Sequence, residues 1–182
     1  MQPKRMLRLL NLLLVVALCF AFASCHSSRT VYRGVDVRQL AQAGNRLGFQ
    51  IDYDDDWPLM LESAQWIGTP YLHAGNTKRG VDCSGLTYNI YNKVYGVSLH
   101  RNSREQYEND CKRVKLRKLQ SGDLVFFDTS TSHPSVETIS HVGIYLKDDL
   151  FIHASSSRGV VVDHLSSNYF RECWVTGGRV KR

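Results

Sequence analysis

The sequence predicts an α+β domain in which helices come first and an antiparallel sheet follows. Between about residues 36 and 96, apolar residues recur at helical spacing. From about residue 123 onward, short β-branched and aromatic runs alternate with Gly, Ser, Asp and Asn, which is typical of antiparallel strands. Helices followed by strands argue against alternating βαβ units. We therefore expect helices packed on an antiparallel sheet of about five to six strands.

The first two expected helices lie in the N-terminal half of the chain. Residues 36–47 place apolar side chains near helical spacing. The stretch FQIDY at 49–53 alternates and could form a short strand. A second helix is expected to begin near Asp56 or Trp57, because Pro58 suits a first helical turn and an apolar face follows.

A third helix is expected to begin in the stretch VDCSGL. Leu86, Ile90 and Val94 recur every four residues, as on one face of a helix. Asp82 is a natural N-cap for this helix. Cys83 therefore falls in its first turn, where free N–H groups stabilise a negative sulfur.

The expected strands occupy the C-terminal half. A polar loop at 128–140 separates two of them, and its length is typical of functional or mobile loops. The runs expected as strands are DLVFF at 123–127, HVGIYL at 141–146, LFIHA at 150–154, GVVVD at 159–163 and CWVTGGRV at 173–180.

The N-terminus has the pattern of an export signal. Residues 1–24 have a basic start, an apolar stretch at 9–22 and then small residues, as in secretory signal peptides. The apolar stretch is shorter than the ~20 residues that a spanning helix needs. The ending FASC resembles the lipobox of bacterial lipoproteins, which makes Cys25 the expected lipidation site; the alternative is ordinary cleavage near Ala23. We expect a tether at 25–35.

The remaining residues, 36–182, have the length of one domain. Loss of the basic start would reduce the net charge from +6 to +3, which is no nucleic-acid footprint. Cys83, Cys111 and Cys173 would remain. Either Cys111 and Cys173 pair, or all three are free. The chain contains neither CxxC nor CxxH spacing, so no zinc pattern is present.

Cys83 is a candidate nucleophile, because its position could activate a thiolate and also provide an N–H for an oxyanion. A buried structural cysteine is the alternative. The helix start and a nearby histidine would lower the pKa of its thiol below the ordinary ~8.5. Two histidines, His141 and His153, lie in consecutive expected strands. Together with Cys83 they could instead hold a metal, but three soft ligands without a carboxylate make this the minority interpretation.

The relative position of the two histidines depends on the turn between their strands. If Leu146 faces Leu150 across a three-residue loop, His153 lies opposite Gly143, and His141 is its diagonal neighbour on the same face. A two-residue loop would shift the register by one and point the histidines to opposite faces. A shared site therefore requires the first register.

Several motifs in order resemble the NlpC family of bacterial cell-wall cysteine endopeptidases. They are GTPYLHAGNTKRGVDCSGL, LQSGDLVFF, SHVGIYL and FIHASSSRGVVV, and the similarity extends from about 66 to 180. The resemblance implies a papain-like α+β fold with the nucleophile at a helix N-terminus. It implies Cys83 as the nucleophile, His141 as the base and His153 as the residue that orients it. Tyr71 and the Cys83 N–H would bind the oxyanion.

The resemblance also implies further contacts and a location. Asp82 and Ser84 match substrate-contacting positions, and Arg101 and Ser103 are weaker candidates whose alternative roles are a solvated turn and a helix cap. We expect a peptidoglycan endopeptidase that acts on murein stem peptides or their cross-links, with no cofactor and no metal. The expected form is a monomeric lipoprotein of the cell envelope, on the periplasmic side of the outer membrane. The alternatives are an inactive wall-binding lipoprotein, or an amidase or acyltransferase that uses the same Cys-His-His site.

Overall fold

The computed structural model describes residues 31–32, 35–130 and 133–181. The expected signal segment and the lipidation site Cys25 lie outside the described residues. Within the expected tether, β1 (Val31–Tyr32) pairs antiparallel with β2 (Val35–Asp36). The described residues up to Val37 belong to one unit and those from Arg38 onward to another, and apart from Val37, the first residue of α2, the second unit contains every element discussed below. Among the described residues, no helix is both long and apolar enough to cross a membrane.

The three expected helices are confirmed. They are α2 (Val37–Leu47), α3 (Trp57–Trp66) and α4 (Cys83–Tyr95). Asp56 is the N-cap of α3 and accepts a hydrogen bond from the Leu59 N–H at 3.2 Å. The cap satisfies one of the free N–H groups at the helix start, as the sequence predicts.

The prediction of a strand at 49–53 is wrong, because the structure has no strand there. The Phe49 N–H donates to the Gly44 carbonyl at 3.2 Å, and the Asp52 N–H donates to the Asp55 carboxylate at 2.6 Å. These backbone groups are therefore used in turns that join α2 to α3. Alternation over only five residues is a weak strand signal when local turn bonds compete for the same donors.

A six-stranded antiparallel sheet forms the second half, in the order β5-β10-β6-β7-β8-β9. All five expected strands are present, and β5 is an additional edge strand. A separate two-stranded ladder, β3 (Asn76–Thr77) with β4 (Gly80–Val81), lies in the loop before α4. The large-sheet strands are β5 (Cys111–Val114), β6 (Leu124–Phe127), β7 (His141–Lys147), β8 (Leu150–Ser155), β9 (Gly159–His164) and β10 (Trp174–Val180).

Short helical segments complete the described fold. They are α5 (Ser103–Glu105), a π-helical turn (Gln106–Asp110), a 3-10 turn (Leu116–Lys118) and α6 (Asn168–Cys173). Because each is shorter than two turns, periodicity gives little signal for them.

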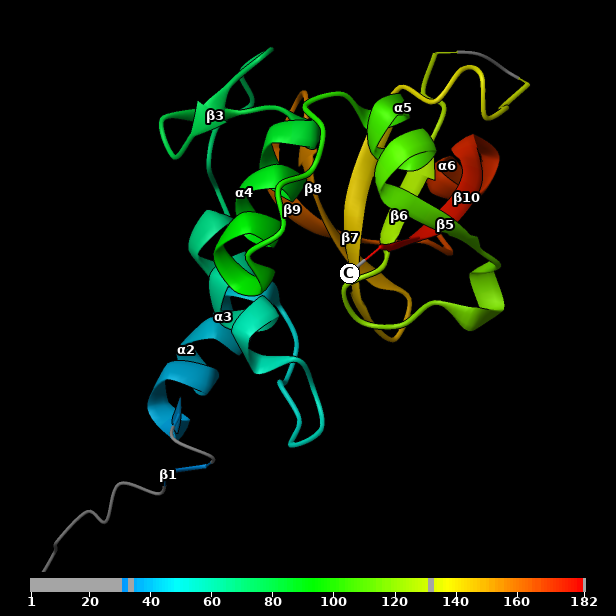
Figure 1. Ribbon diagram of the computed structural model, residues 1–182. Helices are drawn as coiled ribbons and strands as arrows, with labels where there is room; N and C mark the ends of the chain where they lie inside the picture. The colour runs from blue at the N-terminus through cyan, green and yellow to red at the C-terminus, as the bar shows by residue number, and fades with distance from the viewer. Residues whose placement is uncertain (1–30, 33–34, 131–132, 182) are drawn as a thin grey trace, which may run out of the picture. The chain divides into compact units, whose positions relative to one another are not determined.

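The sheet has a different apolar cluster on each face, because successive side chains of a strand point to opposite faces. On one face, α4 packs on β7 and β8, and α3 lies beside α4 (Figure 1). Val142, Ile144 and Ile152 belong to this larger cluster. On the other face, Phe170 of α6 packs with a smaller cluster that includes Phe127. His141 and His153 share the alternation of this second face.

The β7–β8 turn brings the histidines into the shared register by a route other than the expected one. The turn contains only two residues, Asp148 and Asp149, both with positive φ (45° and 71°), and Lys147 pairs with Leu150. A bulge between Tyr145 and Lys147 then shifts the register by one residue, and Gly143 lies opposite His153. The expected three-residue loop is wrong, but the register that it was to produce is confirmed.

The described cysteines Cys83, Cys111 and Cys173 are all free. Cys111 is buried in the larger cluster, where it packs under Gly178, and Cys173 borders the smaller one. The structure therefore corresponds to the alternative in which two of the cysteines fill apolar surroundings.

Candidate active site

Cys83 is the first residue of α4, and the residue before it fixes the start of that helix. Asp82 has extended backbone geometry, and its carboxylate accepts a hydrogen bond from the Gly85 N–H at 2.5 Å. This cap leaves the N–H groups of the first turn available around the sulfur. The side chain of Cys83 is only partly exposed, and its sulfur lies near the backbone N–H groups of Ser84 and Val142.

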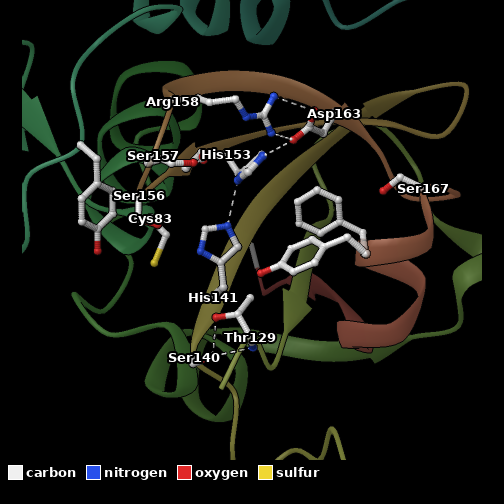
Figure 2. A pocket seen from close by; sticks show the side chains of 15 residues that line it. Cys83, Thr129, Ser140, His141, His153, Ser156, Ser157, Arg158, Asp163 and Ser167 are labelled. Atoms are coloured by element: carbon white, nitrogen blue, oxygen red, sulfur yellow. Dashed lines mark hydrogen bonds and ion pairs between the residues drawn. The ribbon is translucent and has the colours of Figure 1, made fainter. Parts of the chain in front are cut away.

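His141 is the first residue of β7 and lies between Cys83 and a second histidine. Its Nε2 lies 2.9 Å from Nδ1 of His153. Figure 2 shows the His141 ring between the Cys83 sulfur and His153, with its other nitrogen on the sulfur side. Cys83, His141 and His153 therefore lie in a row, in the order that a nucleophile, a base and an orienting residue require.

His153 continues the row to an acidic residue that the sequence analysis did not single out. Its Nε2 lies 2.9 Å from Oδ2 of Asp163, and Arg158 forms an ion pair with the same carboxylate. Three adjacent strands contribute one residue each to the diagonal. In β9, Val161 lies opposite His153, so Asp163 is the diagonal neighbour of His153 just as His141 is on the other side.

Aromatic rings hold the His153 imidazole in place. The Phe151 ring is stacked on it with centroids 4.9 Å apart, and the Phe170 ring meets it edge-on at 5.2 Å. His153 is only 3% exposed. Because a buried imidazole between packed rings has few alternative rotamers, its two nitrogens keep fixed directions.

Burial determines the protonation states of the Cys83 thiol and the His141 imidazole. It raises the pKa of the Cys83 thiol to about 11, with the Asp82 charge adding to the rise, and nearby backbone N–H groups only partly oppose it. Burial also lowers the pKa of His141 to about 3, and His153 contributes further. At neutral pH the resting pair is thus a neutral thiol and a neutral imidazole. The acidic thiol expected from the sequence is wrong for this state, because desolvation outweighs the helix N-terminus.

Asp163 behaves in the opposite way. Burial alone would raise the pKa of its carboxyl, but hydrogen bonds from His153 and Arg158 outweigh burial and lower the pKa to about 2. The row therefore ends in a carboxylate that is ionised over the whole neutral range.

Tyr71 lines the same cavity as Cys83 and the histidines. The backbone of Tyr71 forms an isolated parallel β-bridge with Val81, which lies just before the start of α4. Burial raises the pKa of its hydroxyl, and the Cys83 and Asp82 charges raise it further. The hydroxyl is therefore protonated at neutral pH and can donate a hydrogen bond.

The other expected substrate-binding residues form a polar network around the first turn of α4. Arg101 donates to the Asp82 carboxylate at 3.2 Å, and the Ser84 hydroxyl donates to the same carboxylate at 3.1 Å. Arg101 also donates to the Gly75 carbonyl at 3.1 Å. Ser103 is buried as the first residue of α5, and Asn102 rather than Ser103 caps that helix. The cavity lining contains Tyr71 and Cys83 but not these four residues.

The cavity beside the row has a volume of about 450 Å³. Its walls come from loops on both sides: Thr129 and Ser140 from the two ends of the long loop at 128–140, and the serines of the β8–β9 turn. The Thr129 N–H donates to the Ser140 hydroxyl at 2.9 Å, which closes the loop at its base. The described residues contain no group of three or more His, Cys, Asp or Glu placed to hold a metal ion.

Sequence reasoning missed Asp163 and Arg158, although a signal for both was present. Extending the hairpin argument to the next turn would place Ser155 opposite Gly159 across SSR, and this is the register found. That pairing alone puts Asp163 on the face of His153. The aromatic partner Phe170 gave no comparable signal, since it comes from a six-residue helix whose docking depends on tertiary packing.

The comparison with known sequences identifies the class of protein. The sequence profile of the NlpC/P60 family matches residues 68–179. The chain belongs to this family, which confirms the resemblance and the α+β fold that it implied.

Particular relatives add detail to the family assignment. A probable endopeptidase of Haemophilus influenzae is 38% identical over 116 residues, which are 64% of this chain and 69% of the relative. The murein DD-endopeptidase MepS/murein LD-carboxypeptidase of Escherichia coli is 35% identical over 122 residues, 67% of this chain and 61% of that protein. An NlpC/P60 family protein from Bacillus cereus superposes with a TM-score of 0.60 at 31% identity, covering 68% of this chain and 39% of the other.

Proposed function

We propose that the protein is a peptidoglycan endopeptidase that cleaves an amide bond of the murein stem peptide or cross-link. The observation that carries this proposal is the row Cys83, His141 and His153 in a chain of the NlpC/P60 family. Relatives named as endopeptidases and as a murein DD-endopeptidase support the substrate class. The site contains each group that thiol-dependent amide hydrolysis needs.

The proposed reaction begins from the neutral pair. As the Cys83 sulfur attacks the amide carbonyl carbon, its proton moves to the free ring nitrogen of His141. The carbonyl oxygen becomes an oxyanion that accepts hydrogen bonds from the Cys83 N–H and the Tyr71 hydroxyl. Each such donor is typically worth about a hundredfold or more in rate.

The intermediate then collapses. The C–N bond breaks, the leaving amine takes the proton from His141, and a thioester remains on Cys83. A water molecule gives a proton to His141 and attacks the thioester, which releases the carboxylic acid and restores the thiol. His153 keeps the His141 ring oriented through both steps.

Asp82, Ser84 and Arg101 have a supporting role in this proposal. Their mutual hydrogen bonds fix the start of α4, and Gly85 leaves room for the Arg101 guanidinium: a Cβ there would lie 2.7 Å from its nitrogen. Ser103 is buried as the first residue of α5.

Substitution of the nucleophile tests the proposed activity. Cys83→Ala and Cys83→Ser are expected to abolish digestion of purified sacculi, because neither side chain supplies a sulfur nucleophile. Cys173→Ser, which alters a free thiol bordering the smaller cluster, should digest at the wild-type rate. Digestion by the Cys83→Ala variant at the wild-type rate would sink the proposal.

Mass spectrometry of the released muropeptides separates the rival functions. A cut peptide bond supports an endopeptidase. A cut sugar–peptide link indicates an amidase, a transferred acyl group indicates an acyltransferase, and retained but uncut material indicates a wall-binding protein. The alignment of His141 with both Cys83 and His153 favours catalysis over binding alone, since an inert scaffold has no need of a histidine placed between a thiol and a second histidine.

We further propose that the protein is an exported lipoprotein with Cys25 as the lipid-bearing residue. The basic start, the short apolar stretch and FASC support this assignment. Anchorage on the periplasmic side of the outer membrane would place the enzyme beside the wall and raise its local concentration there. One chain supplies every residue of the proposed site, so a monomer is sufficient for the proposed chemistry.

A further inference from the structure

The histidine row ends in a carboxylate for which the proposed reaction has so far no use. Asp163 Oδ2 lies 2.9 Å from His153 Nε2. Arg158 donates from two guanidinium nitrogens to the two carboxylate oxygens, one of these bonds being 3.2 Å long. Asp163 is thus held in one orientation between a fixed cation and a buried imidazole.

The protonation state of this carboxylate restricts its neighbour. With a pKa near 2, Asp163 is ionised at neutral pH and can only accept hydrogen bonds. His153 must therefore donate from Nε2. When the His153 imidazole is neutral it has a single N–H, so its Nδ1 carries none and acts as an acceptor.

The same restriction passes to His141. Since His153 Nδ1 is an acceptor, the group 2.9 Å away, Nε2 of His141, must be the donor. His141 then carries its proton on Nε2, and its Nδ1 has a free lone pair. Figure 2 shows that this second nitrogen is the one on the side of the Cys83 sulfur.

We propose that Asp163 is a positioning residue that fixes, through His153, the His141 tautomer whose Nδ1 can take the proton of Cys83. This inference deepens the proposed function and rests on it for the role of His141 as base. Asp163 touches neither substrate nor the reacting atoms. It acts by forbidding the alternative tautomer, in which Nδ1 of His141 would carry a hydrogen and could not accept another.

Arg158 and Asp163 have different roles in their ion pair, because Arg158 is the more exposed of the two. Its side chain is 54% exposed, whereas that of Asp163 is 21% exposed. Removal of the guanidinium leaves a carboxylate that still only accepts hydrogen bonds. Arg158 therefore holds Asp163 in orientation, but the carboxylate itself sets the tautomer.

The test is Asp163→Asn, in which the side chain keeps its shape but can either donate or accept. Nitrogen NMR of the full chain labelled at histidine, with His141 assigned by its loss in His141→Gln, reports the tautomer directly. In the wild type His141 is expected as the Nε2–H form, and the variant should show a population of the Nδ1–H form. Asp148→Asn, in the turn at the opposite end of β7, should leave the wild-type signals.

Kinetics on muropeptides gives the second readout. Loss of the orienting carboxylate of a serine-protease triad lowers kcat about 10⁴-fold, and we expect at least about tenfold here with KM unchanged, because His153 remains. On a His153→Gln background, Asp163→Asn should cause no further loss, since Asp163 acts only through that ring. Arg158→Leu should retain the wild-type tautomer, and its thermal unfolding shows whether the hairpin is intact.

Several results would overturn the inference. One is a wild-type His141 in the Nδ1–H form; another is an Asp163→Asn protein with unchanged tautomer and unchanged kcat; a third is a tautomer change in Arg158→Leu equal to that in Asp163→Asn. The NMR readout does not depend on hydrolysis. A wild-type protein that cleaves no stem peptide but shows the Nε2–H form would refute the proposed function and uphold the tautomer control.

Discussion

At the scale of single residues, Cys83 shows how two opposing effects of one position are resolved. The helix start offers N–H groups that favour a thiolate, but burial and the Asp82 charge favour the thiol and win, giving a pKa of about 11. His141 beside it has a pKa of about 3 for the same reason of burial. In the proposed reaction the Cys83 thiol is therefore deprotonated by a base during the attack rather than beforehand.

This protonation state predicts the pH dependence of alkylation. The thiolate is the reactive form, so a raised pKa means that its fraction grows about tenfold per pH unit up to about pH 11. The rate of iodoacetamide addition, followed by mass spectrometry of the Cys83 peptide, is expected to rise steadily from pH 7 to pH 10. A plateau below about pH 8.5 would instead reveal a resting thiolate–imidazolium pair.

Residue identities at the site were largely predictable, whereas their energetics were not. Cys83, His141 and His153 emerge from local patterns and from the resemblance, and the structure brings the three together. The sign of the thiol pKa depends on how much solvent the folded chain removes, a quantity that no local pattern contains. The position of Asp163 on the face of His153 could have been predicted from the β8–β9 register. Its hydrogen bond to His153 could not, because it depends on the rotamers of two side chains on neighbouring strands.

At the scale of elements, predictions succeeded where a strong period or a cap was present. The capped helices α3 and α4 begin at the expected residues, and the apolar strand runs all form strands. β5 was not predicted, because its sequence CKRV is mostly polar and it is a strand only through its pairing with β10. The register of β7 and β8 needed both the turn and the bulge, and a local pattern can suggest a turn more readily than a bulge.

Gly143 connects the register of this hairpin to the position of the histidines. A Cβ at this residue would lie 2.7 Å from the Ile152 carbonyl oxygen and 2.7 Å from the Phe151 ring. The Phe151 ring is the one stacked on His153. The glycine therefore allows the two strands to approach while the imidazole keeps its packed orientation.

Gly143→Ala is expected to destabilise the protein by roughly 1–3 kcal/mol, because close packing forces strand or ring to shift. The free energy of unfolding in urea measures this change. Activity per folded molecule should also fall, since a displaced Phe151 releases the His153 ring. The contrary result is an alanine variant with wild-type stability and wild-type kcat, which would mean that the contact relaxes without moving the site.

At the scale of the whole molecule, the chain combines an NlpC/P60 domain with an N-terminal segment of different composition. The family match, at 68–179, and every residue of the proposed site lie within the unit Arg38–Arg182. The expected export signal and Cys25 precede it in sequence. The proposed chemistry and the proposed lipid anchor thus belong to separate parts of the sequence, and we expect that each can be altered without the other.

Because Cys25 lies outside the NlpC/P60 domain, its substitution is expected to change lipidation but not activity. Incorporation of a labelled fatty acid into the protein in bacterial cells is expected for the wild type and for Cys19→Ser, whose cysteine lies within the apolar stretch. Cys25→Ser should lose the label, because the lipid is joined covalently through the cysteine thiol, which serine lacks. The purified Cys25→Ser protein should still cleave soluble muropeptides at the wild-type rate. Label retained in Cys25→Ser, or absent from the wild type, would argue for ordinary cleavage near Ala23 and a free enzyme.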